Sequence, residues 1–321
     1  MSSTGSDTSA TFTITWAAAP LPTTISGVNG STITLASPSV QTVSGATEWA
    51  AWGHDDAPAI NAALAAGVGA VLIPTNRTLG VYSGLSAPAA TRLDLQCDSA
   101  TIVALAPMSS MFTDPQNAGF FSSEGSTIER CRLDGMGVAQ QNVNHQNFIW
   151  FFRDNVFRNA TVGNLNVNGH GENSIFQSNQ YENDLTIVGA YPQYNKSVNY
   201  TDNHFTDEIE SGAVNNVYDN TAGSYYTNDH GYYATGPNFV LNGGFKADQL
   251  YADGIASNVP GIEVFGTYAN IKGWTAYVSY GTGQIGAYIA TQNGFNTING
   301  GLAQGIANAN VIAVGWGQRI Y

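Results

Sequence analysis

Hydrophobic and polar residues alternate in short runs along most of the chain, with Gly, Asn and Ser between the runs. The segment 92–97 (RLDLQC) is one example. An alternation with a period of two is typical of strands that bury one face. The spacing of three and four residues that marks a helix occurs at 56–66, where Ile60, Ala63 and Leu64 form an apolar stripe. The pattern therefore predicts many short strands and one short helix.

Residues with clear local roles mark the start of this helix and the strand that follows it. Asp55 and Asp56 supply the N-cap and a first-turn carboxylate, and Pro58 stands in the first turn, where its missing N–H costs nothing. The apolar strand 70–73 comes next, and Pro74 ends it. A helix of this kind suits the open end of a stack of strands, because it covers apolar residues and unpaired strand edges.

The sequence GHDDAPAINAALAAGVGAVLIP at 53–74 combines Gly-x-Asp-Asp, a small-residue helix and an apolar strand that ends in Pro. It resembles the N-terminal cap of right-handed parallel β-helix proteins of the pectate-lyase and phage-tailspike type. The segment 49–84 that holds it covers about a tenth of the chain. The resemblance implies an all-β fold: a right-handed, single-stranded parallel β-helix with a short N-terminal capping helix and a small N-terminal β segment. An ordinary βα unit is the alternative interpretation.

A loose repeat follows the cap, in which an Asn opens a short apolar strand every 22 to 33 residues. Its members are Asn159, Asn183, Asn216, Asn238, Asn270 and Asn296. A second series has a similar period, with His230 and Asp253 23 residues apart. Repetition at this period is typical of a solenoid, and we expect Asn at the corners to adopt left-handed turns and to form ladders between coils. A β-sandwich, the alternative all-β fold, would show turns about every 8 to 12 residues.

The first 46 residues differ from the rest and are expected to form a separate module. The run 25–35 predicts a hairpin closed by a type I′ turn at Asn29-Gly30. We therefore divide the chain into 1–46, a β-hairpin leader or attachment module, and 47–321, the parallel β-helix domain. The resemblance suggests that such a leader joins the protein to a larger assembly.

The chain is acidic, since 10 Lys and Arg residues stand against 23 Asp and Glu residues and give a net charge of −13. This balance argues against nucleic acid or an anionic membrane as a partner. It also argues against a strongly acidic substrate, because a lyase that acts on polyuronates needs basic residues to hold carboxylates. A neutral or weakly charged glycan fits the charge better.

Cys97 and Cys131 are the two cysteines of the chain, and both lie in strand-like runs. This placement favours small buried thiols over a disulfide framework. The polar first residues show no signal peptide, and no apolar run reaches transmembrane length. We expect an extracellular or virion-associated protein that is not embedded in a membrane, either trimmed from a longer chain or carried outside as part of a particle.

Acidic residues concentrate at 204–210 (HFTDEIE), one predicted coil before Asp229. If this segment is extended, Glu208 and Glu210 share a face about 6.6 Å apart, and Asp229 faces them from about 4.8 Å away. Paired carboxylates at such distances act as acid and base in glycoside hydrolysis. We therefore predict a glycoside hydrolase, with a lyase as second choice, whose catalytic residues are Glu208, Glu210, Asp229 and His230. A solvated acidic turn is the alternative.

Five tyrosines near this cluster are candidates for stacking on sugar rings. They are Tyr225, Tyr226, Tyr232, Tyr233 and Tyr251. The aromatic run 148–152 (FIWFF) is interpreted as core or as a subunit contact. The Gly-His-Gly around His170 is similar to an element of polygalacturonases, but the aspartates that accompany it there are absent, so His170 is interpreted as a turn residue.

No His and Cys spacing suggests zinc and no Gly-rich segment suggests a phosphate-binding loop, so we expect no cofactor, while scattered Asp and Asn would allow a structural calcium ion. The predicted function is cleavage of a polysaccharide by a tailspike-type depolymerase. Side-by-side association, common among such β-helices, adds the expectation of a homotrimer with 148–152 as its apolar seam. The alternative is a non-catalytic glycan-binding or structural spike or adhesin.

Overall fold

The computed structural model describes most of the chain, and the following sections concern the described residues. They are 11–15, 21–30, 32–37, 49–66, 69–87, 92–114, 125–146, 149–168, 173–182, 188–193, 199–201, 204–206, 215–219, 224–232, 234–241, 245–253, 256, 258–265, 270–277, 285–290, 297–304, 309–314 and 319–320.

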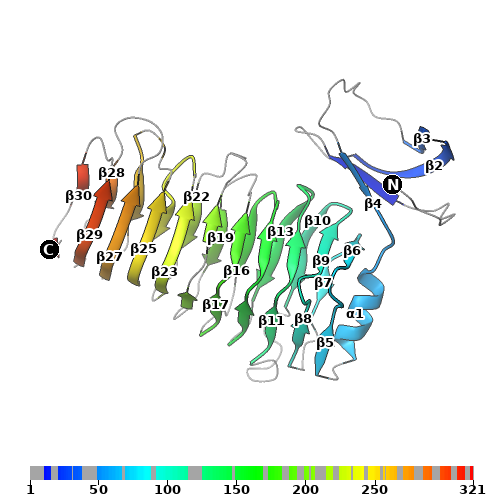
Figure 1. Cartoon of the computed structure of the whole chain (residues 1–321), viewed down its shortest axis with the longest axis horizontal. Helices are drawn as coiled ribbons and strands as arrows, with labels where there is room; N and C mark the ends of the chain where they lie inside the picture. The colour runs from blue at the N-terminus through cyan, green and yellow to red at the C-terminus, as the bar shows by residue number, and fades with distance from the viewer. Residues whose placement is uncertain are drawn as a thin grey trace.

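Two long parallel sheets form the body of the protein, and their strands lie side by side from α1 (Ala57–Ala65) to the C-terminus (Figure 1). The first sheet has ten strands: β7 (Leu85–Ser86), β10 (Met108–Thr113), β13 (Ala139–His145), β16 (Gly163–Asn168), β19 (Val188–Gln193), β22 (Asn215–Asp219), β24 (Phe239–Leu241), β26 (Pro260–Val264), β28 (Ile285–Ala290) and β30 (Ala309–Val314).

The second sheet has seventeen strands, which bend around one corner of the coil: β5 (Ala70–Leu72), β6 (Thr78–Val81), β8 (Asp94–Gln96), β9 (Thr101–Ala104), β11 (Thr127–Glu129), β12 (Arg132–Asp134), β14 (Phe151–Arg153), β15 (Val156–Arg158), β17 (Ile175–Gln177), β18 (Gln180–Glu182), β20 (Asn199–Thr201), β21 (His204–Thr206), β23 (Tyr225–Tyr232), β25 (Lys246–Asp253), β27 (Asn270–Tyr277), β29 (Thr297–Gln304) and β31 (Arg319–Ile320). Each strand pairs in parallel with its counterpart on the next coil. The predicted right-handed parallel β-helix is therefore confirmed, and the sandwich and the βα unit are wrong.

Helix α1 closes one end of the solenoid, where Ile60 and Leu64 are buried in the core. The carboxylates before it act differently from the prediction, because Asp56 stands at the N-cap but makes no side-chain capping bond. Its Oδ2 accepts a hydrogen bond from the Gly80 N–H at 3.0 Å. Asp55 accepts from Ala57 N–H and from Tyr82 N–H. Both carboxylates therefore tie the helix to β6 and its continuation. No described helix is long and apolar enough to cross a membrane.

The core consists of side chains that repeat from coil to coil. Phe152 and Phe176, paired on neighbouring strands, stack with ring centroids 4.8 Å apart. Trp150 and Phe152 are fully buried, which confirms the core interpretation of the aromatic run for these two residues. Neither is available for the predicted subunit seam, and Phe148 lies outside the described residues.

Asparagine ladders run along the corners, as predicted. The side chain of Asn216 donates from Nδ2 to Asn238 Oδ1 at 2.7 Å, and Asn155 donates in the same way to Asn179 at 3.0 Å. The predicted alignment mixes different corners, however. Asn159 stands in a left-handed turn with φ of 57°, whereas Asn216 and Asn238 belong to the ten-stranded face.

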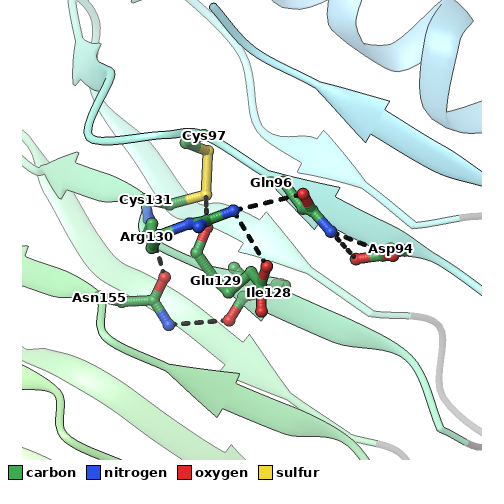
Figure 2. A network of polar contacts seen from close by, with 8 residues as sticks. All are labelled: Asp94, Gln96, Cys97, Ile128, Glu129, Arg130, Cys131 and Asn155. Carbon is green, nitrogen blue, oxygen red and sulfur yellow. Dashed lines mark hydrogen bonds and ion pairs between the residues drawn. A yellow bond between two sulfur atoms is a disulfide. The ribbon is translucent and has the colours of Figure 1, made fainter. Parts of the chain in front are cut away.

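The two cysteines form a disulfide, so the prediction of free buried thiols is wrong. Cys97 follows β8 and Cys131 precedes β12, and the bridge joins two neighbouring coils near the capped end (Figure 2). The two residues are 34 positions apart in the sequence but their Cα atoms are 4.6 Å apart. Stacking of coils creates this proximity, and a prediction without the register of the coils could not find it.

Four antiparallel strands form the N-terminal sheet: β1 (Thr11–Thr15), β2 (Leu21–Asn29), β3 (Thr32–Leu35) and β4 (Trp49–Trp52). The predicted hairpin is present, but Asn29 pairs with Thr32, so Gly30, with φ of 58°, is the first turn residue rather than the second. Strand β4 pairs with β1, which extends the N-terminal sheet beyond the predicted boundary at residue 46.

Candidate functional site

Four neighbouring strands, β23, β25, β27 and β29, share a bend that shapes the outer surface of the C-terminal coils. At the same position each has one residue in the left-handed conformation, with φ between 53° and 62°; these are Asn228, Gln249, Gly273 and Gly300. The bend reverses the alternation of side chains along the strand. Tyr226 and Asp229 are both buried although they are three residues apart, and His230 lies on the outside.

Aromatic side chains gather outside this bend. The His230 and Tyr251 rings, paired on β23 and β25, stack with centroids 4.9 Å apart. The Tyr232 hydroxyl lies 3.0 Å from His230 Nδ1, and its ring is 5.9 Å from that of Tyr251. The shallow groove beside them has a volume of about 450 Å³, and we call it the aromatic groove. It is lined by Asn228, His230, Gln249, Leu250, Tyr251, Gly273, Trp274, Thr275, Gly300 and Gly301.

Glycine and tryptophan also line the aromatic groove. Trp274 packs so closely against Gly301 that a Cβ at Gly301 would collide with the indole ring, and only glycine fits there. Trp274 exposes 4% of its surface and belongs to the hydrophobic core, at the strand position that Asp229 and Leu250 occupy on the preceding coils. Its Nε1–H is buried and has no hydrogen-bond partner among the described residues.

A second groove, of about 190 Å³, adjoins the first on the other side of the bend, and we call it the lysine groove. It is lined by Tyr225, Tyr226, Thr227, Lys246, Ala247, Asp248, Asn270 and Lys272. The Lys246 ammonium lies 5.5 Å from the centroid of the exposed Tyr225 ring. Asn270 Oδ1 is buried and has no hydrogen-bond partner among the residues that the structure describes. This groove thus holds two cations beside polar side chains.

Of the three predicted catalytic carboxylates, the described residues include Asp229. Asp229 is fully buried, and its Oδ2 accepts a hydrogen bond from the Thr227 N–H at 3.0 Å. Burial and then the charge of Asp229 raise the pKa of the Tyr181 phenol well above its ordinary value, which places Asp229 among core residues. It follows the left-handed corner residue just as Asn155 and Asn179 do. Glu208 and Glu210 lie outside the described residues.

The predicted tyrosines divide into two groups. Tyr232 and Tyr251 belong to the aromatic cluster, and Tyr225 is 38% exposed in the lysine groove. Tyr226, in contrast, is buried, and its hydroxyl donates a hydrogen bond to Asp219 Oδ2 at 2.6 Å. Tyr233 and His170 lie outside the described residues.

Sequence reasoning missed several residues of the grooves, among them Lys246, Lys272 and Trp274. An alignment of the coils would have found them, because KADQLYAD and NIKGWTAY occupy the same strand position as YYTNDHGY.

A Ser-His-Asp cluster lies in the core, away from these grooves. The His145 Nε2 atom is 2.8 Å from Ser174 Oγ, and its Nδ1 is 3.2 Å from Asp114 Oδ2. These three types of residue form the catalytic centre of many hydrolases. However, Ser174 and His145 are fully buried among Trp150, Phe152 and other core side chains. The Ser174 hydroxyl also accepts the Trp150 N–H, so we interpret the cluster as a structural link between coils.

The fold defines the chain as a right-handed parallel β-helix protein. No protein-family description and no curated protein sequence matches it.

Solved structures with a related shape include ORF18 of Geobacillus virus E2, which is 15% identical with a TM-score of 0.37 over 82% of this chain. This chain spans 59% of that protein's length. The surface protein and adhesin PfbA of Streptococcus pneumoniae is 12% identical with a TM-score of 0.43, over 84% of this chain and 96% of its own. The Dettilon tailspike protein (gp208) is 9% identical with a TM-score of 0.42, over 83% of this chain and 65% of its own. At these levels of similarity the function has to be argued from the site.

Proposed function

We propose that the chain binds a polysaccharide along the outer face of β23, β25, β27 and β29. The observation that carries the proposal is the cluster of aromatic side chains beside two adjoining grooves that cross these strands. Tyr251 stacks on His230 with ring centroids 4.9 Å apart, and the Tyr232 hydroxyl lies 3.0 Å from His230 Nδ1. Sugar hydroxyl groups both donate and accept, so they suit the polar side chains that line the two grooves.

Aromatic rings support a sugar ligand rather than another hydroxyl-bearing molecule. The C–H faces of sugar rings pack on aromatic faces, and Tyr251 lines the aromatic groove beside its glycines. The hydroxyl of Tyr232 and the ring of His230 add polar groups at the same edge. This combination of a flat apolar surface and polar groups matches the two faces of a pyranose.

The course of the two grooves supports a polymer. They cross successive coils, and neighbouring coils lie about 4.8 Å apart, which is close to the length of one extended sugar unit. A glycan that runs along the solenoid axis would place successive sugars over successive coils. A monosaccharide would use only part of this surface.

The disulfide supports an extracellular or virion-associated setting, because disulfides persist in oxidising compartments. A homotrimer and a structural calcium ion stay predictions from the sequence.

Hydrolysis of the bound glycan, with elimination as the second choice, is the finer form of this proposal. It rests on Glu208 and Glu210, since the buried Asp229 does not face the grooves. The alternative is a spike or adhesin that binds the glycan without cleaving it.

A panel of purified polysaccharides tests the proposal by affinity electrophoresis, together with assays for new reducing ends and for unsaturated ends. We expect Tyr251→Ala to weaken binding about tenfold, equivalent to about 1.4 kcal/mol. Tyr288→Ala, on the ten-stranded sheet, is the matched control and should bind like the wild type. Absence of binding to every polysaccharide, or equal losses in both variants, would overturn the proposal. Release of ends separates the hydrolase, the lyase and the pure binder.

A further inference from the structure

The lysines of the chain are concentrated in one place. The sequence contains three lysines, and two of them, Lys246 and Lys272, line the lysine groove. The protein as a whole has a net charge of −13. Interactions between exposed charges are screened beyond about 8 Å at physiological salt, so a ligand in the groove responds mainly to these nearby residues rather than to the total charge.

The two ammonium groups are held on neighbouring coils. Lys246 pairs in register with Asn270, and Lys272 is two residues further along the same strand. With about 4.8 Å across and 6.6 Å along the strands, their backbones are on the order of 8 Å apart. Neither lysine forms an ion pair with a residue that the structure describes. Both charges are therefore available to a ligand.

One acidic residue, Asp248, belongs to the same groove and pairs in register with Lys272. Two cations and one anion leave the groove with a net charge of about +1. This value suits a ligand whose negative charges are single and well separated, such as one carboxylate per sugar. A polymer with closely spaced multiple charges would meet repulsion from Asp248.

We propose that the lysine groove binds the carboxylates of an acidic polysaccharide whose neighbouring sugars pack in the aromatic groove. The inference rests on the proposed function and names its substrate class. It replaces the expectation of a neutral or weakly charged glycan, which was drawn from the total charge. A lysine ammonium is a compact charge with three donors, so each of the two lysines can hold a carboxylate at the groove.

The test compares the wild type on polygalacturonate, alginate and hyaluronate with the carboxyl-reduced form of each polymer, at low and at physiological salt. We expect at least one acidic polymer to bind about tenfold more tightly than its reduced form, with the preference falling as salt rises. The double variant Lys246→Gln, Lys272→Gln should lose about tenfold in affinity for that polymer. Arg132→Gln, which removes an exposed cation from β12, is the control and should change nothing.

Asp248→Asn gives a result of opposite sign. Removing its negative charge should strengthen binding of the acidic polymer by about threefold, whereas a purely structural role of Asp248 would leave the affinity unchanged or weaken it. Equal affinity for an acidic polymer and its reduced form, or a double lysine variant that binds like the wild type, would overturn the inference. If either of these results is found but Tyr251→Ala still weakens binding, the proposed function stands without the inference about acidic polysaccharides. Absence of binding to any polysaccharide overturns the proposed function and the inference together.

Discussion

Reduction of the disulfide should destabilise the capped end of the solenoid by a predictable amount. The bridge closes a loop between residues 34 positions apart. The chain-entropy relation for this loop gives about 12.6 cal/mol/K, or about 3.8 kcal/mol at 25 °C. This value is a large part of the total stability of an ordinary domain, which is about 5 to 15 kcal/mol.

Hydrogen bonds around the bridge determine where the effect is felt (Figure 2). The Cys131 N–H donates to Asn155 Oδ1 at 3.0 Å, and Asn155 Nδ2 donates to the Ile128 carbonyl at 2.9 Å. The bridge thus stands at the start of a corner ladder between the first coils. Stability in solenoids is mainly a sum of neighbouring repeats, so loss of the bridge should loosen these coils and leave β23 to β29 in place.

Urea denaturation with and without a phosphine reductant measures the change, and the variant Cys97→Ala, Cys131→Ala controls for other effects of the reagent. We expect the wild type to lose about 3 to 4 kcal/mol on reduction, the variant to be insensitive, and glycan affinity to be unchanged in native conditions. A loss below about 1 kcal/mol would show that the loop is already constrained without the bridge. A loss of glycan affinity would refute the local nature of the effect.

Two further substitutions test the placement of acidic residues. Asp229→Asn should change glycan binding and any cleavage by less than about threefold, because the side chain is buried and Asn occupies the equivalent corner positions 155 and 179; a loss of about a thousandfold with an intact fold would restore Asp229 as a catalyst. Burial raises the pKa of Glu263 above its ordinary value. The protonated carboxyl group therefore stabilises the folded state below the unfolded pKa of about 4.3, and this stabilisation is lost as pH rises through the folded pKa. Glu263→Gln should therefore reduce the fall in stability over that pH range, measured by thermal unfolding, and an unchanged pH profile would contradict this assignment.

Much of the fold could be predicted because its signals are local. The capping helix shows itself through the spacing of Ile60 and Leu64, and the corners through residues that favour left-handed turns, such as Asn159. The register between coils carries no such local signal. The second predicted series matched His230 with Asp253, whereas His230 in fact pairs with Tyr251. Loops of unequal length between the strands cause this error. The same lack of a register between coils also concealed the disulfide.

The bend in β23 explains both the burial of Asp229 and the formation of the aromatic cluster. In a continuous strand, Thr227 and Asp229 would point to the same side, which would place the carboxylate on the surface. The left-handed Asn228 reverses the alternation, so that Asp229 enters the core and His230 reaches the surface. Gln249 makes the same bend in β25 and brings out Tyr251, although glutamine is not a residue that favours this conformation. The burial of the predicted carboxylate and the stacking of His230 on Tyr251 therefore have one cause, the left-handed residue in each strand. This cause becomes visible only when neighbouring coils are aligned with one another.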